Sequence, residues 1–243
     1  KIPGMRMLYR SAIRSATGVV VYSKELETLV RENYARRGPL ITITSGVEKD
    51  LFRPLDKLEC RRQLNLPTQR KLIGAAGTLS EIKNTQVLIE AFQALAKTRD
   101  DIILVLAGAL GSDFSIPKDP RIIYLGELAH EEIALFLNSL DLAVICYKES
   151  PCGQTAYPTR IMEAIACQVP FVCADVGSFR TILENDPRYL FSSNDKIDLM
   201  RAIEAQISDP SRFEMDQKSW HEYIKELEAF ILACCDANHA RAA

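Results

Sequence analysis

Along most of the chain, short apolar runs alternate with stretches in which apolar residues recur every three or four positions. Apolar runs of this length predict buried β-strands, and the three- to four-residue spacing predicts amphipathic helices. The predicted strands span residues 41–44, 72–76, 102–107, 122–125, 142–146, 171–174 and 189–191. The clearest predicted helices span residues 85–97, 130–139 and 158–167. This alternation is typical of an α/β fold with a parallel sheet covered by helices on both faces.

The two ends of the chain differ from this pattern. Residues 5–16, 19–22 and 24–34 predict a helix, a strand and a second helix, with Ser23 as the N-cap of the latter. On the first helix, Arg6, Arg10 and Arg14 recur every four residues along one face. This basic face has two interpretations: it is simply solvated, or it contacts anionic lipid or a phosphate-bearing acceptor.

The C-terminal segment predicts helices over residues 195–207 and 212–235. The second carries a long apolar stripe that includes Trp220, Tyr223 and Phe230. Such a stripe needs a partner surface, in this chain or in another.

Composition excludes several classes of function. The formal net charge of the 243 residues is −2, so the chain lacks the basic surface that grips a nucleic-acid backbone. Its longest apolar runs are of strand length, and no secretory leader is visible after Lys1. The seven cysteines form no CxxC pair and the three histidines lie far from them, which disfavours a zinc site and a disulfide framework. A reducing cytoplasm is the expected setting.

Candidate chemistry lies in two loops that follow predicted strands. The chain contains no GxGxxG, Walker, HExxH or GxSxG motif. In the loop 77–84, Gly77 permits a tight exit from the strand and Lys83 precedes a helix, where an anion is favoured. In the second loop, Pro158 opens a helix that carries Glu163, a carboxylate able to bind a ribose diol. An exposed lysine and a first-turn acid that stabilises its helix are the simpler interpretations of Lys83 and Glu163.

Six segments in order carry a resemblance to a known family. They are Ser45–Pro54 (similar to "NGVD...F.P"), Gly77–Asn84 ("GRLxxxKG"), Leu104–Gly108 ("LxIxG"), Ile123–Leu128 ("hxFxGxV"), Met162–Val172 ("LEAMAcGxPVV") and Lys218–Trp220 ("fsW"). This order resembles the C-terminal half of glycosyltransferase family 4, the "group 1" family of two-domain GT-B enzymes. The resemblance covers most of the chain and implies a Rossmann-like sheet.

The resemblance implies an activity and a division of the chain. The reaction is transfer of a hexosyl-type sugar, with retention of configuration, from a UDP-, GDP- or ADP-sugar to a hydroxyl of a glycan or lipid-linked acceptor. Neither a cofactor nor a metal is expected. Residues 1–40 would close an N-terminal acceptor domain, and residues 41–208 would form the donor-binding domain. Residues 209–243 would form a helix that crosses back toward the acceptor domain. By this reading the fragment is incomplete and inactive alone, and acts in the cytoplasm or at the inner membrane surface in polysaccharide biosynthesis.

The resemblance also assigns roles to residues. Lys83 is expected at the diphosphate and Glu163 at the ribose, as the residues that carry catalysis. Backbone groups of Gly126, Glu127 and Leu128 would contact the base, and Glu149 and Gln154 the sugar. The remaining expected binding residues are Gly77, Thr78, Thr155, Thr159 and Arg160.

Two departures from the family pattern concern the site. Thr155 stands where the family carries the first of two glutamates, and Thr78 stands where it carries an arginine. We hypothesise that Arg160 replaces the lost cation. The departures leave two other functions open: a non-catalytic nucleotide-sugar-binding module, and a nucleotide-sugar epimerase of the same fold.

Overall fold

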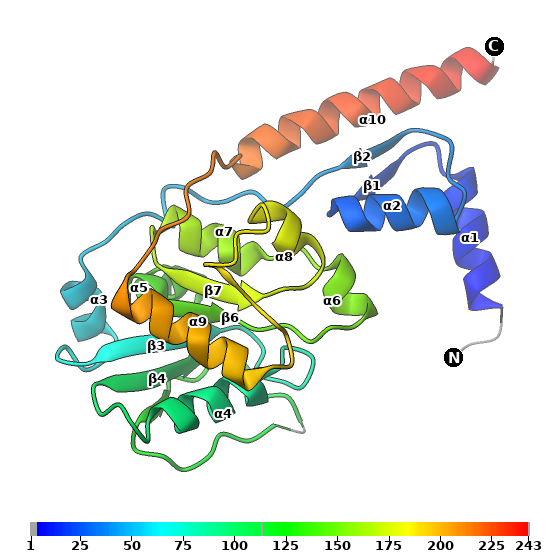
Figure 1. The fold of residues 1–243 in the computed structure, drawn as a ribbon. Coiled ribbons are helices and arrows are strands. Elements are labelled where there is room, and N and C mark those ends of the chain that lie inside the picture. The colour runs from blue at the N-terminus through cyan, green and yellow to red at the C-terminus, as the bar shows by residue number, and fades with distance from the viewer. Residues whose placement is uncertain (1–3, 113, 243) are drawn as a thin grey trace.

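The centre of the molecule is a six-stranded, all-parallel sheet in the order β5-β4-β3-β6-β7-β8 (Figure 1). The computed structural model describes residues 4–112 and 114–242. The strands are β3 (Lys71–Ala76), β4 (Ile102–Ala107), β5 (Ile122–Tyr124), β6 (Leu142–Ile145), β7 (Phe171–Ala174) and β8 (Leu190–Phe191). Each strand predicted between residues 72 and 191 is confirmed, with small differences at the ends.

Helices cover both faces of this sheet (Figure 1). On one face α3 (Lys57–Gln63), α5 (His130–Ser139) and α7 (Thr159–Ala166) pack together, and on the other α4 (Thr85–Leu95) packs on α9 (Lys196–Ser208). Two short helices, α6 (Pro151–Thr155) and α8 (Gly177–Ile182), lie beyond the strand ends. The predicted α/β class is confirmed. The pattern missed α3, α6 and α8, because helices of two turns or fewer show too little periodicity.

The strand order reverses direction in the middle of the sheet. From β3 the chain runs outward through β4 to β5, then crosses back so that β6 pairs with the other side of β3. The loops that leave the carboxyl ends of β3 and β6 therefore diverge. In open parallel sheets such a switch point is where ligands bind.

The sheet holds together through a continuous apolar core and a partly buried ionic cluster around Asp141. Leu72, Leu104 and Phe171 are fully buried within this core. The carboxylate of Asp141, just before β6, accepts hydrogen bonds from Arg61 at 2.6 Å, Lys57 at 2.9 Å and the Leu72 amide at 2.7 Å. Burial would raise the pKa of Asp141, but these partners hold it below its usual value. Asp141 thus ties α3 to the start of both central strands.

Residues 4–44 form a separate unit, here called the N-terminal unit. It contains α1 (Met5–Ser15), β1 (Val19–Val21), α2 (Lys24–Asn33) and β2 (Leu40–Thr42), and β1 pairs with β2 in parallel. The strand predicted at 41–44 therefore pairs with β1 and not with the central sheet, and the domain boundary predicted at residue 40 falls at the first residue of β2. The Oγ of Ser23 accepts from the Leu26 amide at 3.1 Å, which confirms the predicted N-cap.

Two arginines in the N-terminal unit serve local structure. The buried guanidinium of Arg36 donates to five backbone carbonyls, those of Ile13, Arg14, Ala16, Thr17 and Pro39. Arg6, Arg10 and Arg14 are all exposed, and Arg14 donates to the carbonyl of Tyr34 at 2.9 Å. The basic face of α1 is therefore partly used to hold α1 against the end of α2.

The last helix, α10 (Trp220–Ala242), begins eight residues later than the sequence pattern predicts. Residues 210–219 are not helical, and the predicted start at Arg212 is wrong. The reason is a capping box: the Ser219 amide donates to Glu222 Oε2 at 2.7 Å, and Ser219 Oγ accepts from the Glu222 amide at 3.3 Å.

The helix α10 passes beside β1 and β2 (Figure 1). A side chain at Gly18 would collide with Phe230 and Cys234 on its apolar stripe. The partner that the stripe requires is thus the N-terminal unit. Within residues 4–112 and 114–242, no helix is long and apolar enough to span a membrane.

Candidate functional site

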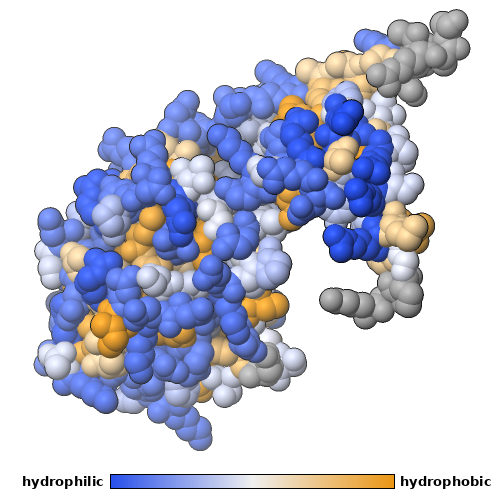
Figure 2. All heavy atoms as spheres, turned by 45° about the vertical axis from the view of Figure 1, so that its right-hand side comes forward, coloured by the Kyte–Doolittle hydropathy of each residue, from blue (hydrophilic) through white to orange (hydrophobic). Residues whose placement is uncertain are grey.

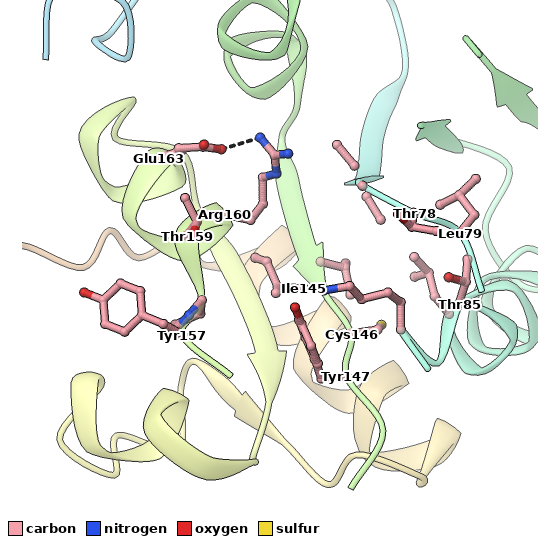
Figure 3. Close-up of a pocket in the computed structure, with 17 residues that line it drawn as sticks. Thr78, Leu79, Thr85, Ile145, Cys146, Tyr147, Tyr157, Thr159, Arg160 and Glu163 are labelled. Atoms are coloured by element: carbon pink, nitrogen blue, oxygen red, sulfur yellow. Dashed lines mark hydrogen bonds and ion pairs between the residues drawn. The ribbon is translucent and has the colours of Figure 1, made fainter. Parts of the chain in front are cut away.

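A cavity of about 280 Å³ lies at the switch point of the central sheet. Thr78, Leu79 and Thr85 lie on one side, Thr159, Arg160 and Glu163 lie on the other, and Ile145–Tyr147 lie between them (Figure 3). The first group follows β3, the second begins α7, and the third ends β6. The two loops selected from the sequence therefore meet in one cavity, as their places after neighbouring strands require.

Three glycines follow adjacent strands near this cavity, and one of them, Gly77, lines it. Gly77, Gly108 and Gly126 follow β3, β4 and β5, and all three have positive φ, at 131°, 124° and 75°. The Gly77 amide donates to the Ala107 carbonyl at 3.0 Å, and the Gly108 amide donates to the Gly126 carbonyl at 2.7 Å. A side chain at Gly108 would collide with the Gly77 carbonyl. At Gly108 this close approach requires glycine, whereas a side chain at Gly77 or Gly126 would meet no atom within 4 Å, and glycine there serves the positive φ.

Lys83 brings a cation into the cavity without a carboxylate partner. Among the described residues, no acidic side chain lies within ion-pair distance of its Nζ, which instead sits 3.5 Å from the centroid of the Tyr147 ring. Burial lowers the pKa of Lys83 to about 8, with Cys152 acting to raise it and Arg160 acting to lower it. A bound anion would stabilise the charged form of an ammonium group that is desolvated and lies beside a second cation.

Arg160 and Glu163 form an ion pair one turn apart on α7 (Figure 3). Glu163 is buried, and burial raises the pKa of its carboxyl group, against the opposing effects of Arg160 and His130. Arg160 also lies beside the first turn of α7, where backbone amides favour an anion. Arg160 thus pairs with the Glu163 carboxylate and also lies at the start of α7.

A contact between His130 and Glu48 lies near Glu163 and was missed from the sequence. His130 Nε2, at the start of α5, lies 3.2 Å from Glu48 Oε1, and the His130 ring packs edge-on against Phe52. Both His130 and Glu48 influence the pKa of Glu163. No sequence signal links these positions, because Glu48 and His130 lie 82 residues apart.

The predicted site residues divide into two groups. Those that line the cavity are Gly77, Thr78, Lys83, Thr159, Arg160 and Glu163. Those that lie outside its lining are Gly126, Glu127, Leu128, Glu149, Gln154 and Thr155. The structure also adds Tyr147, Tyr157 and Thr85 to the lining, which sequence reasoning did not select.

The residues outside the cavity lie in its surroundings. Gly126 follows β5, two strands away from β3, Glu127 is exposed, and Leu128 packs against the core. The side-chain amide of Gln154 donates to Glu149 at 3.5 Å, so these two residues face each other. The hydroxyl of Thr155 donates to the Pro151 carbonyl inside α6 at 3.1 Å. Thr155 therefore satisfies its own helix and does not point into the cavity.

The chemistry available in the cavity is recognition of a polyanion. It offers two cations and a helix N-terminus for phosphate-type oxygens, and one buried carboxylate that can accept from hydroxyl groups. Among the described residues, no group of three or more His, Cys, Asp or Glu side chains is arranged to hold a metal ion.

Comparison with known proteins identifies the family. Residues 56–227 match the profile of the family described as "Glycosyl transferases group 1". The D-inositol 3-phosphate glycosyltransferase of Stackebrandtia nassauensis is 26% identical over an alignment of 208 residues, which covers 78% of this chain and 46% of that protein. The chain thus spans about half the length of the curated relatives that it matches.

Two solved structures share the fold. Anabaena HepE in complex with UDP and glucose superposes with a TM-score of 0.70 at 22% identity, covering 84% of this chain and 57% of HepE. The C-terminal domain of the group 1 glycosyltransferase LpcC from Francisella tularensis gives a TM-score of 0.57 at 24% identity, covering 68% of this chain and 89% of that domain. With the family profile matching most of its length, this chain belongs to the group 1 glycosyltransferases.

Proposed function

We propose that this chain is the donor-binding half of a retaining glycosyltransferase and that its cavity binds the diphosphate of a UDP-, GDP- or ADP-sugar. The observation that carries the proposal is the convergence of Lys83, Arg160 and the start of α7 on one cavity at the switch point. Lys83 has no acidic partner among the described residues, so a diphosphate would be its counter-ion. The UDP and glucose in the HepE structure support a nucleotide-sugar donor.

In this proposal each cavity residue has a distinct role. Lys83 and the N-terminus of α7 neutralise the charge that develops on the leaving diphosphate, as fixed dipoles and cations do best in a desolvated site. Glu163 accepts hydrogen bonds from the ribose hydroxyls, and Arg160 orients Glu163 while its remaining N–H groups reach toward phosphate. Backbone groups of Gly126, Glu127 and Leu128 receive the base, and Glu149 and Gln154 approach the sugar.

Transfer of a hexosyl unit to an acceptor hydroxyl requires a second half that presents the acceptor. The N-terminal unit is the part of the chain that adjoins such a half, and the chain alone is expected to bind the donor without turning it over. We place the reaction in the cytoplasm, with Arg6 and Arg10 available for an anionic membrane surface.

Calorimetric titration with UDP, GDP and ADP tests the proposal directly. We expect one nucleotide to bind and its affinity to fall at least about tenfold in both Lys83→Ala and Glu163→Gln, since each removes a charge-assisted contact. Lys71→Ala, at the opposite end of β3, and Glu131→Gln, exposed on α5, are matched controls that should bind normally. Binding of none of the three nucleotides would contradict the proposal.

Arg160→Ala separates the two roles of the second cation. If Arg160 takes over the role of the arginine that the family carries at the position of Thr78, this variant loses affinity for the nucleotide to an extent similar to Lys83→Ala. Unchanged affinity in Arg160→Ala, with loss in Lys83→Ala, would limit Arg160 to its ion pair with Glu163.

One observation favours a non-catalytic module as the second candidate. Thr155 replaces the first glutamate of the family pattern, and its hydroxyl is bonded within α6. If the chain only binds nucleotide sugars, then the chain together with its acceptor half will release no nucleoside diphosphate from the donor it binds. An epimerase would instead turn over the donor without any acceptor.

A further inference from the structure

Lys83 differs from the other lysines in its surroundings. Among the described lysines, Lys83 and Lys148 are half-buried and the others are exposed. Exposed charged side chains make the face of the molecule in Figure 2 mostly hydrophilic. Lys148 pairs with the carboxylate of Glu81, as expected of an ammonium that is partly buried. The Nζ of Lys83 lies instead 3.5 Å from the centroid of the Tyr147 ring, which takes the place of a carboxylate.

An aromatic ring attracts an ammonium group without cancelling its charge. The face of the ring carries partial negative charge, which attracts a cation that lies within about 6 Å of the ring centroid. A carboxylate at the same place would form an ion pair, and a diphosphate would have to break that pair before it could bind Lys83. On Tyr147, in contrast, the ammonium has no anionic partner to give up. The contact therefore suits a cation whose counter-ion is a bound ligand.

The Tyr147 ring is itself held in place. It packs edge to face with the fully buried ring of Phe179 on α8, with the centroids 5.1 Å apart and the ring planes at 83°. The Tyr147 carbonyl accepts a hydrogen bond from the hydroxyl of Ser193, a buried residue in the loop between β8 and α9. The same hydroxyl accepts from the Glu149 amide at 3.1 Å. Both the ring and the backbone of Tyr147 are therefore fixed from the core.

The two loops that carry the ammonium and the ring are joined to each other on both sides of Lys83. On one side, the Lys148 amide donates to the Ile82 carbonyl at 3.1 Å. On the other side, the side-chain amide of Asn84 donates to the carbonyl of Ser193, the residue that also holds the ring. The distance between the ammonium and the ring is thus set by the fold before any ligand binds, and such preorganisation lowers the entropy cost of binding.

We propose that Tyr147 is a positioning residue for Lys83, and that the face of its ring holds the ammonium in the cavity where the diphosphate of the donor binds. This inference rests on the proposed function, because the diphosphate is the anion assigned to Lys83. Tyr147 acts through Lys83, so the ring should strengthen nucleotide binding only while the lysine is present. The phenyl ring of phenylalanine should serve as well, because the contact uses the face of the ring.

A double-mutant cycle tests this coupling. Calorimetry with UDP, GDP and ADP would compare the intact chain with Tyr147→Leu, Lys83→Met and the double variant. For the nucleotide that binds, Tyr147→Leu should lower the affinity by about tenfold and Tyr147→Phe by less than about twofold. In the Lys83→Met background, Tyr147→Leu should cause no further loss. A similar loss in both backgrounds would overturn the inference, because it would show that Tyr147 shapes the cavity without acting through Lys83.

A second measurement needs no nucleotide. An aromatic ring shifts the NMR signals of protons above its face upfield. In the chain labelled with ¹³C-lysine, the ε-methylene signal that disappears in Lys83→Met should therefore lie upfield of those of the exposed lysines. Tyr147→Leu should remove this shift, whereas Tyr147→Phe and the control Tyr9→Leu, at an exposed tyrosine on α1, should keep it.

The two measurements separate the two proposals. Nucleotide binding without the upfield signal would overturn the role of Tyr147 and leave the donor function standing. The upfield signal without binding of any nucleotide would overturn the donor function, while the contact between ring and ammonium would be confirmed.

Discussion

The central body and the N-terminal unit bury their hydrophobic residues to different extents. In the body, side chains such as Leu72, Phe92 and Leu104 are fully buried. Among the described residues of the N-terminal unit, Val21 and Val30 are the buried hydrophobic side chains, and α1 buries none. The body is therefore stabilised by its own core, whereas the unit depends on α10 and on the hydrogen bonds of Arg36.

The largest expected effect on stability comes from creating a cavity in the core of the central body. Phe92→Ala removes a fully buried ring of α4 and should lower the free energy of unfolding of the body by about 3–5 kcal/mol. Tyr9→Ala, on exposed α1, should change it by less than about 0.5 kcal/mol. Urea denaturation followed by circular dichroism measures both, and similar losses in the two variants would contradict the comparison.

A smaller and local effect is expected at Arg36. Arg36→Met leaves five backbone carbonyls without their donor and should destabilise the N-terminal unit by at least about 2 kcal/mol. Hydrogen exchange should then speed up in residues 4–44 and in α10, while β3 and β4 keep their protection. Arg37→Met, an exposed neighbour, is the control. Faster exchange throughout the central sheet would show that the two regions unfold together.

The cavity at the carboxyl edge of the central sheet should bind nucleotide with an affinity that depends on pH. Nucleotide binding favours the charged form of Lys83, whose pKa without nucleotide is about 8. The affinity for nucleotide is therefore retained below pH 8 and falls by roughly tenfold for each pH unit above it. The phosphates are already ionised over this range. Calorimetry between pH 7 and 9 measures this loss. Lys83→Arg should remove it, because arginine stays protonated, and an identical pH profile in that variant would exclude Lys83 as its source.

The smallest effect concerns stability without ligand. Lys83→Met removes a desolvated ammonium that has no carboxylate partner among the described residues, and should raise the stability of the empty chain by about 0.5 kcal/mol at pH 7. The gain should shrink as pH rises from about 8 toward the ordinary lysine pKa of 10.5, since the unfolded chain then binds more protons than the folded one. Thermal denaturation at pH 7 and pH 9.5 gives the comparison, and a lower melting temperature in the variant at pH 7 would contradict it.

The sequence was most informative where the structure is most buried. Strands such as 102–107 and helix 130–139 were predicted at their exact bounds, because a continuous apolar run or a strong stripe leaves one favourable arrangement. The start of α10 was predicted wrongly at Arg212, although the pattern Ser-x-x-Glu at Ser219–Glu222 was a readable signal for the correct start.

Part of the candidate site was predictable from local sequence patterns. Lys83 and Glu163 were found because each stands near the start of a helix that follows a strand. The ion pair of Arg160 with Glu163 joins positions three residues apart on one helix, so it could have been predicted from the sequence. The assignment of Arg160 to phosphate stays a prediction. Tyr147 and the pair of Glu48 with His130 had no local signal, since their partners are distant in the chain.

The sequence by itself determined the α/β class, most of the elements and the two loops that carry charge, because these depend on local periodicity and on residue type. The tertiary structure decided how those loops are used. It placed β6 beside β3 and so brought Lys83 and Arg160 into one cavity, and it left the Thr155 hydroxyl bonded within its own helix. It also brought Tyr22 and Trp220, 198 positions apart, into the lining of one cavity. Contacts of this kind depend on strand order and helix packing, which local periodicity does not specify.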